Sequence, residues 1–185
     1  MIKSLYPKFQ SWSEKGSAYL YSDPHFEDDD MAKYFDYATP EEQIENINRI
    51  VTKNDYFICL GDCGDPSYFE KIKCKNIVII LGNHDQSATK FIPYAKEIYT
   101  GPLFIGEKIL LSHEPIGLPF VVNIHGHDHS NMAYYRDGCK YYNVAANVIN
   151  YQPVSLGKLI KDGLLANIPS IHRITIDRAS NKNIE

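Results

Sequence analysis

Acidic, amide and imidazole side chains directly follow several short apolar segments of this sequence. Leu60-Gly61-Asp62 ends the apolar segment 56–60, and Leu81-Gly82-Asn83-His84-Asp85 ends the apolar segment 77–81. Carboxylate, amide and imidazole groups are ligands for Mn, Fe or Zn, whereas a structural zinc site is usually rich in cysteine. The spacing therefore predicts a metal site built from oxygen and nitrogen ligands.

The same pattern recurs along the chain. The candidate residues at predicted strand ends are Asp23, His25, Asp62, Asn83, His84, His113, His127 and His129. Five of the seven histidines belong to this set, and each stands beside a turn-forming residue rather than on an apolar face. A single histidine of this kind would mean little, but five at strand ends favour a shared site over separate structural roles.

Two adjacent strands and their neighbours must bring these residues together. Apolar segments rich in β-branched residues and bounded by Gly are typical of buried parallel strands, and active groups collect beyond the carboxyl ends of such strands. We expect a strand over 17–22, a helix that begins at Pro40 with Thr39 as its N-cap, a strand over 56–60, a short helix over 66–73 and a strand over 77–81. These elements form consecutive β-α-β units with right-handed crossovers.

The second half of the chain has shorter segments. Strands are expected over 97–100, 103–105, 108–112, 120–124, 132–135, 141–144 and 171–176, with a hairpin turn over 105–108. Ser155 is expected to cap a helix over 156–162 that Gly163 ends, and the polar tail from Ala179 to be frayed. A parallel first half and an antiparallel second half predict two packed sheets flanked by helices, in a single domain over 1–185.

The amino-acid composition limits the kinds of binding partner that we expect. The formal net charge is −4 and the cations are scattered, so binding of duplex nucleic acid is not expected. No apolar segment approaches the roughly 18 residues of a membrane span, and no secretory signal is visible. Cys59, Cys63, Cys74 and Cys139 have no paired spacing, which favours reduced thiols in a cytoplasmic protein. Cys63 is interpreted as a small turn residue beside Asp62, with oxidation sensitivity as the alternative.

The chemistry-bearing residues form five blocks that resemble the calcineurin-like metallophosphoesterases. The blocks are Asp23-x-His25, Gly61-Asp62-x-x-Asp65, Gly82-Asn83-His84-Asp85, Ser112-His113 and Gly126-His127-x-His129, in the order of that family and over residues 23–129. Residues 142–155 also look like small, capless bacterial members. The resemblance implies an α/β fold, a four-layer α-β-β-α sandwich of two mixed sheets flanked by helices.

The resemblance also implies a role for each residue. Asp23, His25 and His129 would hold one divalent metal ion, Asn83, His113 and His127 would hold a second, and Asp62 would bridge both. Manganese is the expected metal, and iron or zinc accept the same ligands. A metal-bridging hydroxide would attack a phosphodiester or phosphomonoester, with His84 assisting the leaving group. Asp85 would orient the His84 ring, although a turn-capping role for Asp85 is an open alternative.

Two departures from the family pattern bear on the substrate. Pro66 follows Asp65 where the family usually has Arg, so Asp65 is not counted as a ligand. The acidic run 27–30 follows His25 in place of a Gly-containing turn. We expect this run to be a solvated loop at the mouth of the site, where it shapes access. Its charge would repel polyanions and favours a small or singly charged phosphate ester.

Other readings of the same residues stay open. His125 is interpreted as a core or supporting histidine rather than a ligand, and His172 has no visible link to the site. A non-catalytic interaction scaffold on the same fold is the main alternative, although a scaffold has no need of His84. A nuclease is a further alternative, because the fourteen tyrosines include side chains able to stack on bases. The oligomeric state is open.

Overall fold

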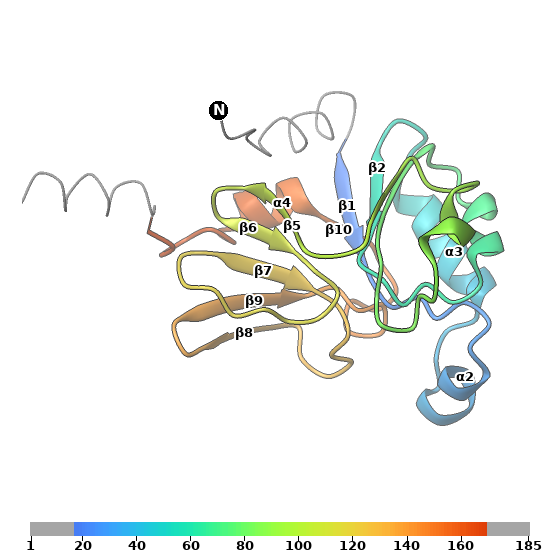
Figure 1. Ribbon diagram of the computed structural model, residues 1–185, viewed down its shortest axis with the longest axis horizontal. Coiled ribbons are helices and arrows are strands. Elements are labelled where there is room, and N and C mark those ends of the chain that lie inside the picture. Colours follow the sequence, from blue (N-terminus) through green and yellow to red (C-terminus); the bar gives the residue numbers. More distant parts are fainter. Residues whose placement is uncertain (1–16, 170–185) are drawn as a thin grey trace, which may run out of the picture.

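Two five-stranded sheets share one hydrophobic core in the computed structural model, which describes residues 17–169 (Figure 1). The first sheet has the order β10-β1-β2-β3-β4, and the second has the order β5-β6-β7-β9-β8. The strands of the first sheet are β1 (Ala18–Tyr21), β2 (Tyr56–Cys59), β3 (Asn76–Ile80), β4 (Glu97–Tyr99) and β10 (Val154–Ser155). Those of the second are β5 (Leu103–Gly106), β6 (Ile109–Leu111), β7 (Val122–His125), β8 (Ala133–Arg136) and β9 (Cys139–Asn143).

Both sheets are mixed. In the first, β1 to β4 pair in parallel and β10 adds antiparallel to β1. In the second, β6, β7 and β9 are parallel, and the edge strands β5 and β8 are antiparallel to their neighbours. The expectation of an antiparallel second half is therefore wrong for its three central strands. Strand β8 forms a hairpin with β9, and this leaves β9 free to pair in parallel with β7.

The helices of the first sheet begin where the sequence predicts. Helix α3 (Pro40–Ile50) has a capping box, in which the Thr39 side chain accepts the Glu42 amide and the Glu42 side chain accepts the Thr39 amide. Its apolar face buries Ile44 and Ile47. The predicted short helix after β2 is the 3-10 helix η1 (Pro66–Lys71), and a second 3-10 helix, η2 (Ala88–Phe91), follows β3.

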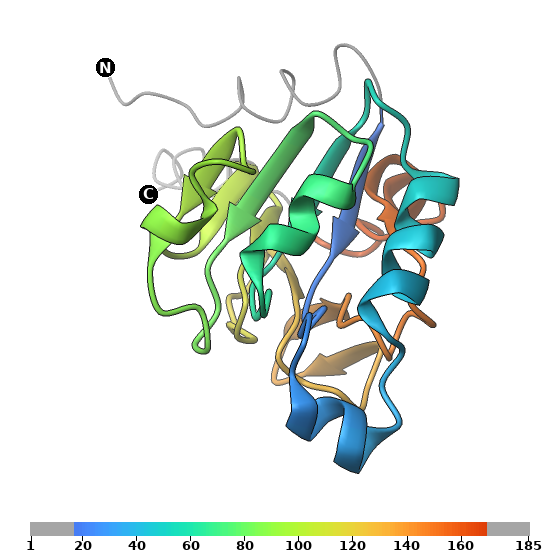
Figure 2. The same cartoon turned by 90° about the vertical axis from the view of Figure 1, so that its right-hand side faces the viewer.

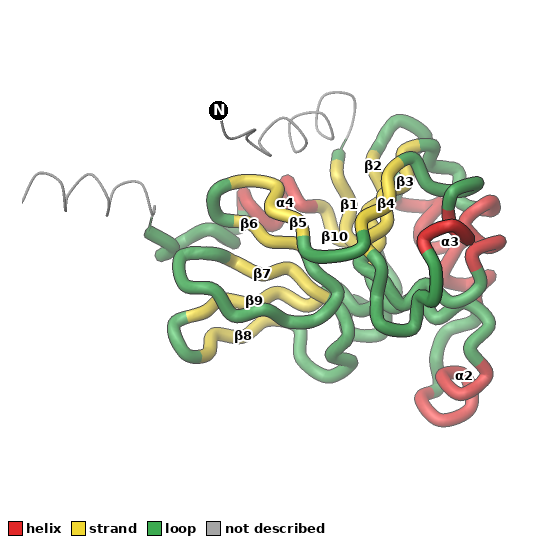
Figure 3. Tube along the Cα trace, in the orientation of Figure 1, coloured by secondary structure: helices red, strands yellow, loops and turns green. Residues whose placement is uncertain are grey.

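The second half of the acidic run lies in a helix, which corrects the expectation of a loop, whereas Glu27, Asp29 and Asp30 are exposed to solvent as expected. Helix α2 (Asp29–Phe35) has loop on both sides (Figure 3) and extends from the carboxyl end of β1 (Figure 2). Asp28 is its N-cap and accepts the amides of Asp30 and Met31. Met31 is buried and anchors the helix, and the negative charges of Asp29 and Asp30 are favourable in the first turn.

The C-terminal part of the described chain holds helix α4 (Leu156–Lys161), whose N-cap Ser155 accepts the Lys158 amide as expected. The predicted strand over 171–176, His172 and the tail from Ala179 lie outside the described residues. No helix within residues 17–169 is long and apolar enough to cross a membrane. Two mixed sheets with helices confirm the predicted α/β fold class.

The four cysteines are buried and free. The Cys59 and Cys63 sulfur atoms lie 3.7 Å apart beside the turn that carries Asp62. Burial raises the pKa of the Cys63 thiol well above its usual value, so this thiol stays protonated and unreactive.

Candidate metal centre

The predicted ligands meet where five strands end. Asp23 and His25 follow β1, Asp62 follows β2, and Asn83 follows β3, all from the first sheet. The second sheet contributes the residues that follow β6 and β7, which are His113, His127 and His129. Because parallel strands of one sheet end at the same edge, the side chains gather on one side of the molecule.

Backbone hydrogen bonds join the loops that carry these residues. The Asp23 amide donates to the Gly61 carbonyl at 2.9 Å, and the His25 amide donates to the Asp62 carbonyl at 3.1 Å. The loops approach so closely that a Cβ atom on Gly82 would lie 2.2 Å from Asp62 Oδ1. A Cβ atom on Gly126 would lie 2.2 Å from Asp23 Oδ2. Glycine is therefore required at both contacts with the carboxylates.

Four of the seven predicted ligands have left-handed backbone conformations. The φ angles are 54° at Asp23, 46° at His25, 48° at Asp62 and 63° at His127. Such conformations are uncommon for residues other than glycine and carry strain of roughly 1–3 kcal/mol each. The surrounding loop contacts hold them in place, and strain of this kind gathers at sites that bind ligands.

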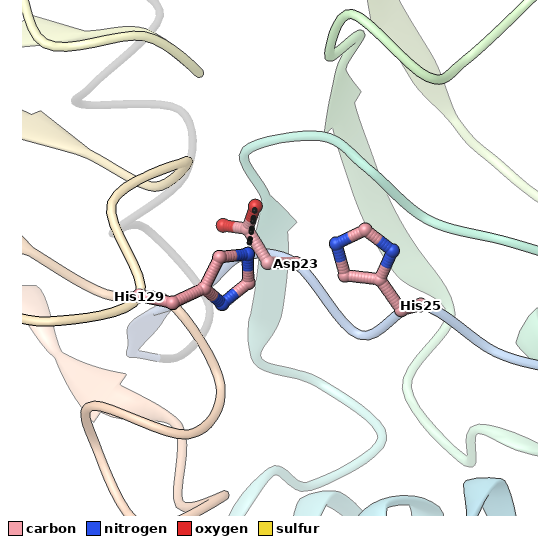
Figure 4. A group of neighbouring side chains, drawn as sticks. All are labelled: Asp23, His25 and His129. Atoms are coloured by element: carbon pink, nitrogen blue, oxygen red, sulfur yellow. Dashed lines mark ion pairs between the residues drawn. The ribbon is translucent and has the colours of Figure 1, made fainter. Parts of the chain in front are cut away.

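The first group of possible metal ligands consists of Asp23, His25 and His129 (Figure 4). One ligand atom from each residue lies within 4.8 Å of the other two, and His129 Nε2 is 3.8 Å from Asp23 Oδ1. Asp23 Oδ1 and His25 Nε2 are buried without a hydrogen-bond partner. Buried polar atoms are normally paired, so these two unpaired atoms fit a bound cation.

The second group consists of Asp62, His113 and His127, and Asn83 lies beside it. Asn83 Oδ1 is 2.8 Å from His113 Nε2 and 3.1 Å from His127 Nδ1. His113 Nδ1 donates to the Leu60 carbonyl at 2.9 Å, so in the neutral ring Nε2 carries a lone pair. Lone pairs of several neighbouring groups therefore converge on one point, which favours a cation there.

Asp62 lies between the two groups. Its Oδ2 is 3.2 Å from His113 Nε2 in the second group and 4.0 Å from His25 Nε2 in the first. Burial alone would raise the pKa of Asp62, but the His113 ring and the His84 amide outweigh it and lower the pKa. An ionised, buried carboxylate with one oxygen between two ligand groups is suited to contact a cation on each side.

The carboxylates also act on His113. Burial alone would lower the pKa of His113, but its hydrogen bond to Asp62 and the charges of Asp23 and Asp62 raise the pKa. The site therefore stabilises positive charge at Nε2 of His113. The donor set, of oxygen and imidazole nitrogen atoms, fits Mn, Fe or Zn.

Hydrogen bonds at three of the four candidate ligand histidines fix which ring nitrogen is free. His113 Nδ1 donates to the Leu60 carbonyl. His129 Nδ1 lies 3.0 Å from Asn147 Oδ1, and His25 Nδ1 lies 3.0 Å from Asp28 Oδ2. In each case Nδ1 donates and Nε2 faces the candidate site. Sequence reasoning missed Asn147 and Asp28. The three-residue spacing of Asp28 from His25, within one turn, was the available signal for Asp28.

Tyr37 is a third residue that sequence reasoning missed. Its hydroxyl donates to the Asp23 carbonyl at 2.6 Å, and its ring stands edge-on to the rings of His25 and His129. Burial raises the pKa of Tyr37, so the hydroxyl remains a donor. Tyr37 thus contacts all three residues of the first group.

The structure changes the role expected for Asp85. Its carboxylate accepts the amides of Gly82 at 2.8 Å, Asp62 at 3.0 Å and Cys63 at 3.0 Å. Within the described residues, no hydrogen bond joins Asp85 to the His84 ring. Its two oxygens are occupied by backbone donors, so Asp85 holds the β2 and β3 loops together, as in the turn-capping alternative.

His84 itself is exposed at the edge of the first group. Its amide donates to Asp62 Oδ1 at 2.9 Å, and its ring centroid is 5.9 Å from that of His25. It lines a cavity of about 620 Å³ whose other walls are His25, Phe26, Gly64 and the carboxylate residues Glu27, Asp28, Asp29, Asp30 and Asp65. This cavity has no lysine or arginine in its lining.

Asp65 and His125 lie outside both ligand groups. Asp65 is the N-cap of η1 and accepts the Ser67 amide at 2.8 Å. His125 is fully buried, donates from Nδ1 to the Gly126 carbonyl at 2.7 Å, and packs edge-on against Tyr134 and Tyr141. Both residues therefore support neighbouring loops, as the sequence analysis expected.

Comparison with known proteins identifies relatives of this chain. The family model described as calcineurin-like phosphoesterase matches residues 18–148. An uncharacterized protein of Methanocaldococcus jannaschii is 33% identical in an alignment that covers 77% of this chain and 89% of that protein. A solved structure of a protein of unknown function from Aquifex aeolicus aligns with a TM-score of 0.64 at 21% identity, covering 79% of this chain and 98% of that one. A phosphoesterase from E. coli aligns with a TM-score of 0.43 at 18% identity over 69% and 78% of the two chains.

Proposed function

The chain belongs to the calcineurin-like phosphoesterase family, and from this premise we propose that it is a hydrolase that cleaves phosphate esters with two divalent cations. One observation carries the proposal. Two groups of ligand atoms converge on either side of the same buried carboxylate oxygen, Asp62 Oδ2. A scaffold that only binds another protein has no need of such an arrangement.

The residues divide into two sets of ligands in this proposal. Asp23, His25 and His129 hold one cation, His113, His127 and Asn83 hold the other, and Asp62 is shared. When bound, a pair of divalent cations supplies Lewis acidity toward the phosphoryl group and lowers the pKa of water. Asp28, Asn147 and the Leu60 carbonyl keep the ring protons of three histidines away from the site.

His84 is the proton donor or electrostatic stabiliser for the leaving oxygen. It lies outside both ligand groups, its ring is exposed, and it borders the cavity next to the first group. Its amide donates to Asp62, which fixes the His84 backbone next to the shared ligand. A positioned acid of this kind is typically worth 10²–10⁴-fold in rate.

The cavity beside His84 favours a substrate with little negative charge. Five carboxylate side chains line it, and no basic side chain does. A phosphodiester carries one negative charge at neutral pH, whereas a phosphomonoester carries roughly 1.5–2. We therefore propose a small phosphodiester as the preferred substrate class, with manganese as the first metal to test.

The test is metal content measured beside hydrolysis of bis-p-nitrophenyl phosphate and p-nitrophenyl phosphate, with added Mn²⁺ and with a chelator. We expect about two metal ions per chain, turnover that the chelator abolishes, and faster hydrolysis of the diester. Two bound metals without turnover of either ester would favour the scaffold alternative. No bound metal under any loading would overturn the proposed function.

A further inference from the structure

The Asp28 carboxylate makes two kinds of contact at once. Its Oδ1 accepts the amides of Asp30 at 3.1 Å and Met31 at 3.2 Å, which caps helix α2. Its Oδ2 lies 3.0 Å from Nδ1 of His25. The Asp28 amide also donates to the His25 carbonyl at 3.1 Å, so both residues belong to one closed turn.

These contacts determine which nitrogen of His25 is available. An ionised carboxylate only accepts hydrogen bonds, so the proton of the neutral ring stays on Nδ1 and Nε2 has the lone pair. That Nε2 is buried, has no hydrogen-bond partner and lies 4.0 Å from Asp62 Oδ2. A carboxylate behind a ligating imidazole also makes the ring a stronger donor to a metal.

Asp28 differs from the groups that orient the other candidate histidines. His113 is oriented by the neutral Leu60 carbonyl, and His129 by the neutral amide of Asn147. Among these three ring-orienting partners, only Asp28 is charged. The first ligand group therefore receives more negative charge than its own three residues supply.

We propose that Asp28 is a positioning residue that strengthens the first metal site through His25 and couples that site to the folding of helix α2. A seven-residue helix is not stable alone, and its cap is one of its main supports. A cation that fixes His25 also fixes Asp28, and with it the first turn of α2. Coupling of this kind is reciprocal, so the folded helix in turn favours the loaded site.

The coupling reaches the substrate cavity. The segment from Glu27 to Asp30 forms one wall of the cavity that His84 and His25 also line. Glu27, Asp28 and Asp29 also line a second cavity of about 480 Å³ on the side of Tyr37 and α3. Loading of the first site would therefore fix the wall between the two cavities before substrate enters.

The decisive variant is Asp28→Ser, because serine caps helices about as well as aspartate but is too short to reach His25. Asp28→Asn is the second variant, because its single carboxamide oxygen cannot serve the helix amides and His25 together. Asp29→Asn is the matched control, because it removes one negative charge at the neighbouring position and leaves the contact between Asp28 and His25 in place. This inference rests on the proposed metal centre, so the unmodified protein is titrated first.

Isothermal titration with Mn²⁺ should find two bound ions in the unmodified protein and in Asp29→Asn. Asp28→Ser should weaken one of the two affinities by about 10–100-fold and leave the other within about threefold. Two unchanged affinities in Asp28→Ser and Asp28→Asn would overturn the inference and leave the proposed function intact. Failure of the unmodified protein to bind Mn²⁺ would instead count against the proposed function.

Two readouts separate positioning from a merely structural role. In the metal-free protein, nitrogen NMR should find the His25 proton on Nδ1, and a mixture of both ring forms in Asp28→Ser. Hydrogen exchange at Asp30 and Met31 should slow when Mn²⁺ is added to the unmodified protein but not to Asp28→Ser. An unchanged ring form, or equal metal-induced protection in that variant, would contradict the coupling.

Discussion

At the scale of single residues, Asp62 is the side chain that lies between the two ligand groups and approaches both. One oxygen lies between His113 and His25, and the other accepts the His84 amide. Asp62 is 2% exposed, so water does not solvate its charge. A buried carboxylate needs charged or hydrogen-bonding partners, and His113 and the His84 amide supply them in the absence of a cation.

Asp62→Asn should lose most of the bound metal and nearly all turnover, because an amide oxygen keeps the size of the side chain but not its charge. Metal content by elemental analysis and hydrolysis of the diester check this. Asp65→Asn is the control, since Asp65 lies outside both ligand groups and asparagine also caps η1. Full activity with two metal ions retained in Asp62→Asn would exclude the bridging role.

His84→Ala should retain both metal ions and lose about 10²–10⁴-fold in turnover. The ring is exposed and contributes to neither ligand group, so its removal leaves the ligands in place. A diester with a poor leaving group should lose more activity than the p-nitrophenyl ester, because its leaving oxygen depends more on protonation. Normal turnover of both esters would rule out the acid role.

At the scale of elements, helix α2 carries the acidic wall of the cavity. Asp29 and Asp30 are exposed in its first turn and line the cavity with His84. Their carboxylates are not needed for the cap, which Asp28 provides. They are therefore free to select substrates by charge.

The double variant Asp29→Asn, Asp30→Asn should raise kcat/KM for an ester that carries additional phosphate groups, with little change for the singly charged diester. Two fewer negative charges reduce the repulsion, so the gain should shrink as salt is added. Steady-state kinetics at low and high ionic strength measure this effect. Glu45→Gln on the exposed face of α3 is the control, and an equal gain in that variant would argue against local selection.

Asp55 joins two other elements. Its carboxylate accepts the amides of Ser17 and Thr52, both at 2.7 Å, and so ties the start of β1 to the turn between α3 and β2. Burial alone would raise the pKa of Asp55, but the Thr52 and Ser17 hydrogen bonds outweigh it and lower the pKa. A folded-state pKa below the unfolded value means that this stabilisation is present above about pH 4 and is lost as the pH falls through the folded pKa.

Asp55→Asn should therefore lower the free energy of unfolding by about 1–2 kcal/mol at pH 7, with a smaller difference from the unmodified protein at pH 3. Urea unfolding followed by circular dichroism at both pH values checks the sign. An equal difference at pH 7 and pH 3 would show that the charge of Asp55 is not responsible.

The elements show what the sequence could and could not predict. The N-cap at Thr39 and the Gly-bounded strands before Asp62 and Asn83 are local patterns, and both were predicted. The parallel pairing of β7 with β9 requires β8, which lies between them in the sequence, to take the edge of the sheet, and no local pattern reveals that placement. The acidic run was misjudged because its composition indicates solvation, whereas the Asp28 cap and the buried Met31 form a helix.

The same distinction applies within the site. The gathering of the candidate side chains could be predicted because each follows a strand end, and the family resemblance supplied their expected grouping. The supporting contacts of Asn147 and Tyr37 could not, because they depend on loops that meet only in the folded structure. Of the two roles left open for Asp85, the contacts favour turn capping, since three backbone amides donate to its carboxylate.

At the scale of the whole molecule, each ligand group draws on both sheets. Asp23 and His25 come from the first sheet and His129 from the second, and the other group joins Asp62 to His113 and His127 in the same way. Cations bound in these groups would act as cross-links between the sheets. Without them, the repulsion among the site's carboxylates and lone pairs opposes docking of the sheets.

Mn²⁺ should therefore raise the melting temperature of the protein. At a concentration 100 times the dissociation constant, each site adds about 2.7 kcal/mol to the free energy of unfolding. Differential scanning calorimetry with Mn²⁺ and with chelator measures the shift, and Asp62→Asn should remove most of it. A melting temperature unaffected by the metal would mean that the ligand groups do not bind it in the folded state.

The Asp23 carboxylate and the His127 amide are hydrogen-bonded although 104 positions separate them in the chain. Closing a loop of that length costs more conformational entropy than closing a short one. A chain whose β1 to β4 sheet has formed still lacks His113, His127 and His129 at the site. In the proposed function, full metal binding would therefore require both sheets, and stopped-flow mixing with a metal-sensitive dye would test whether metal uptake follows docking of the second sheet.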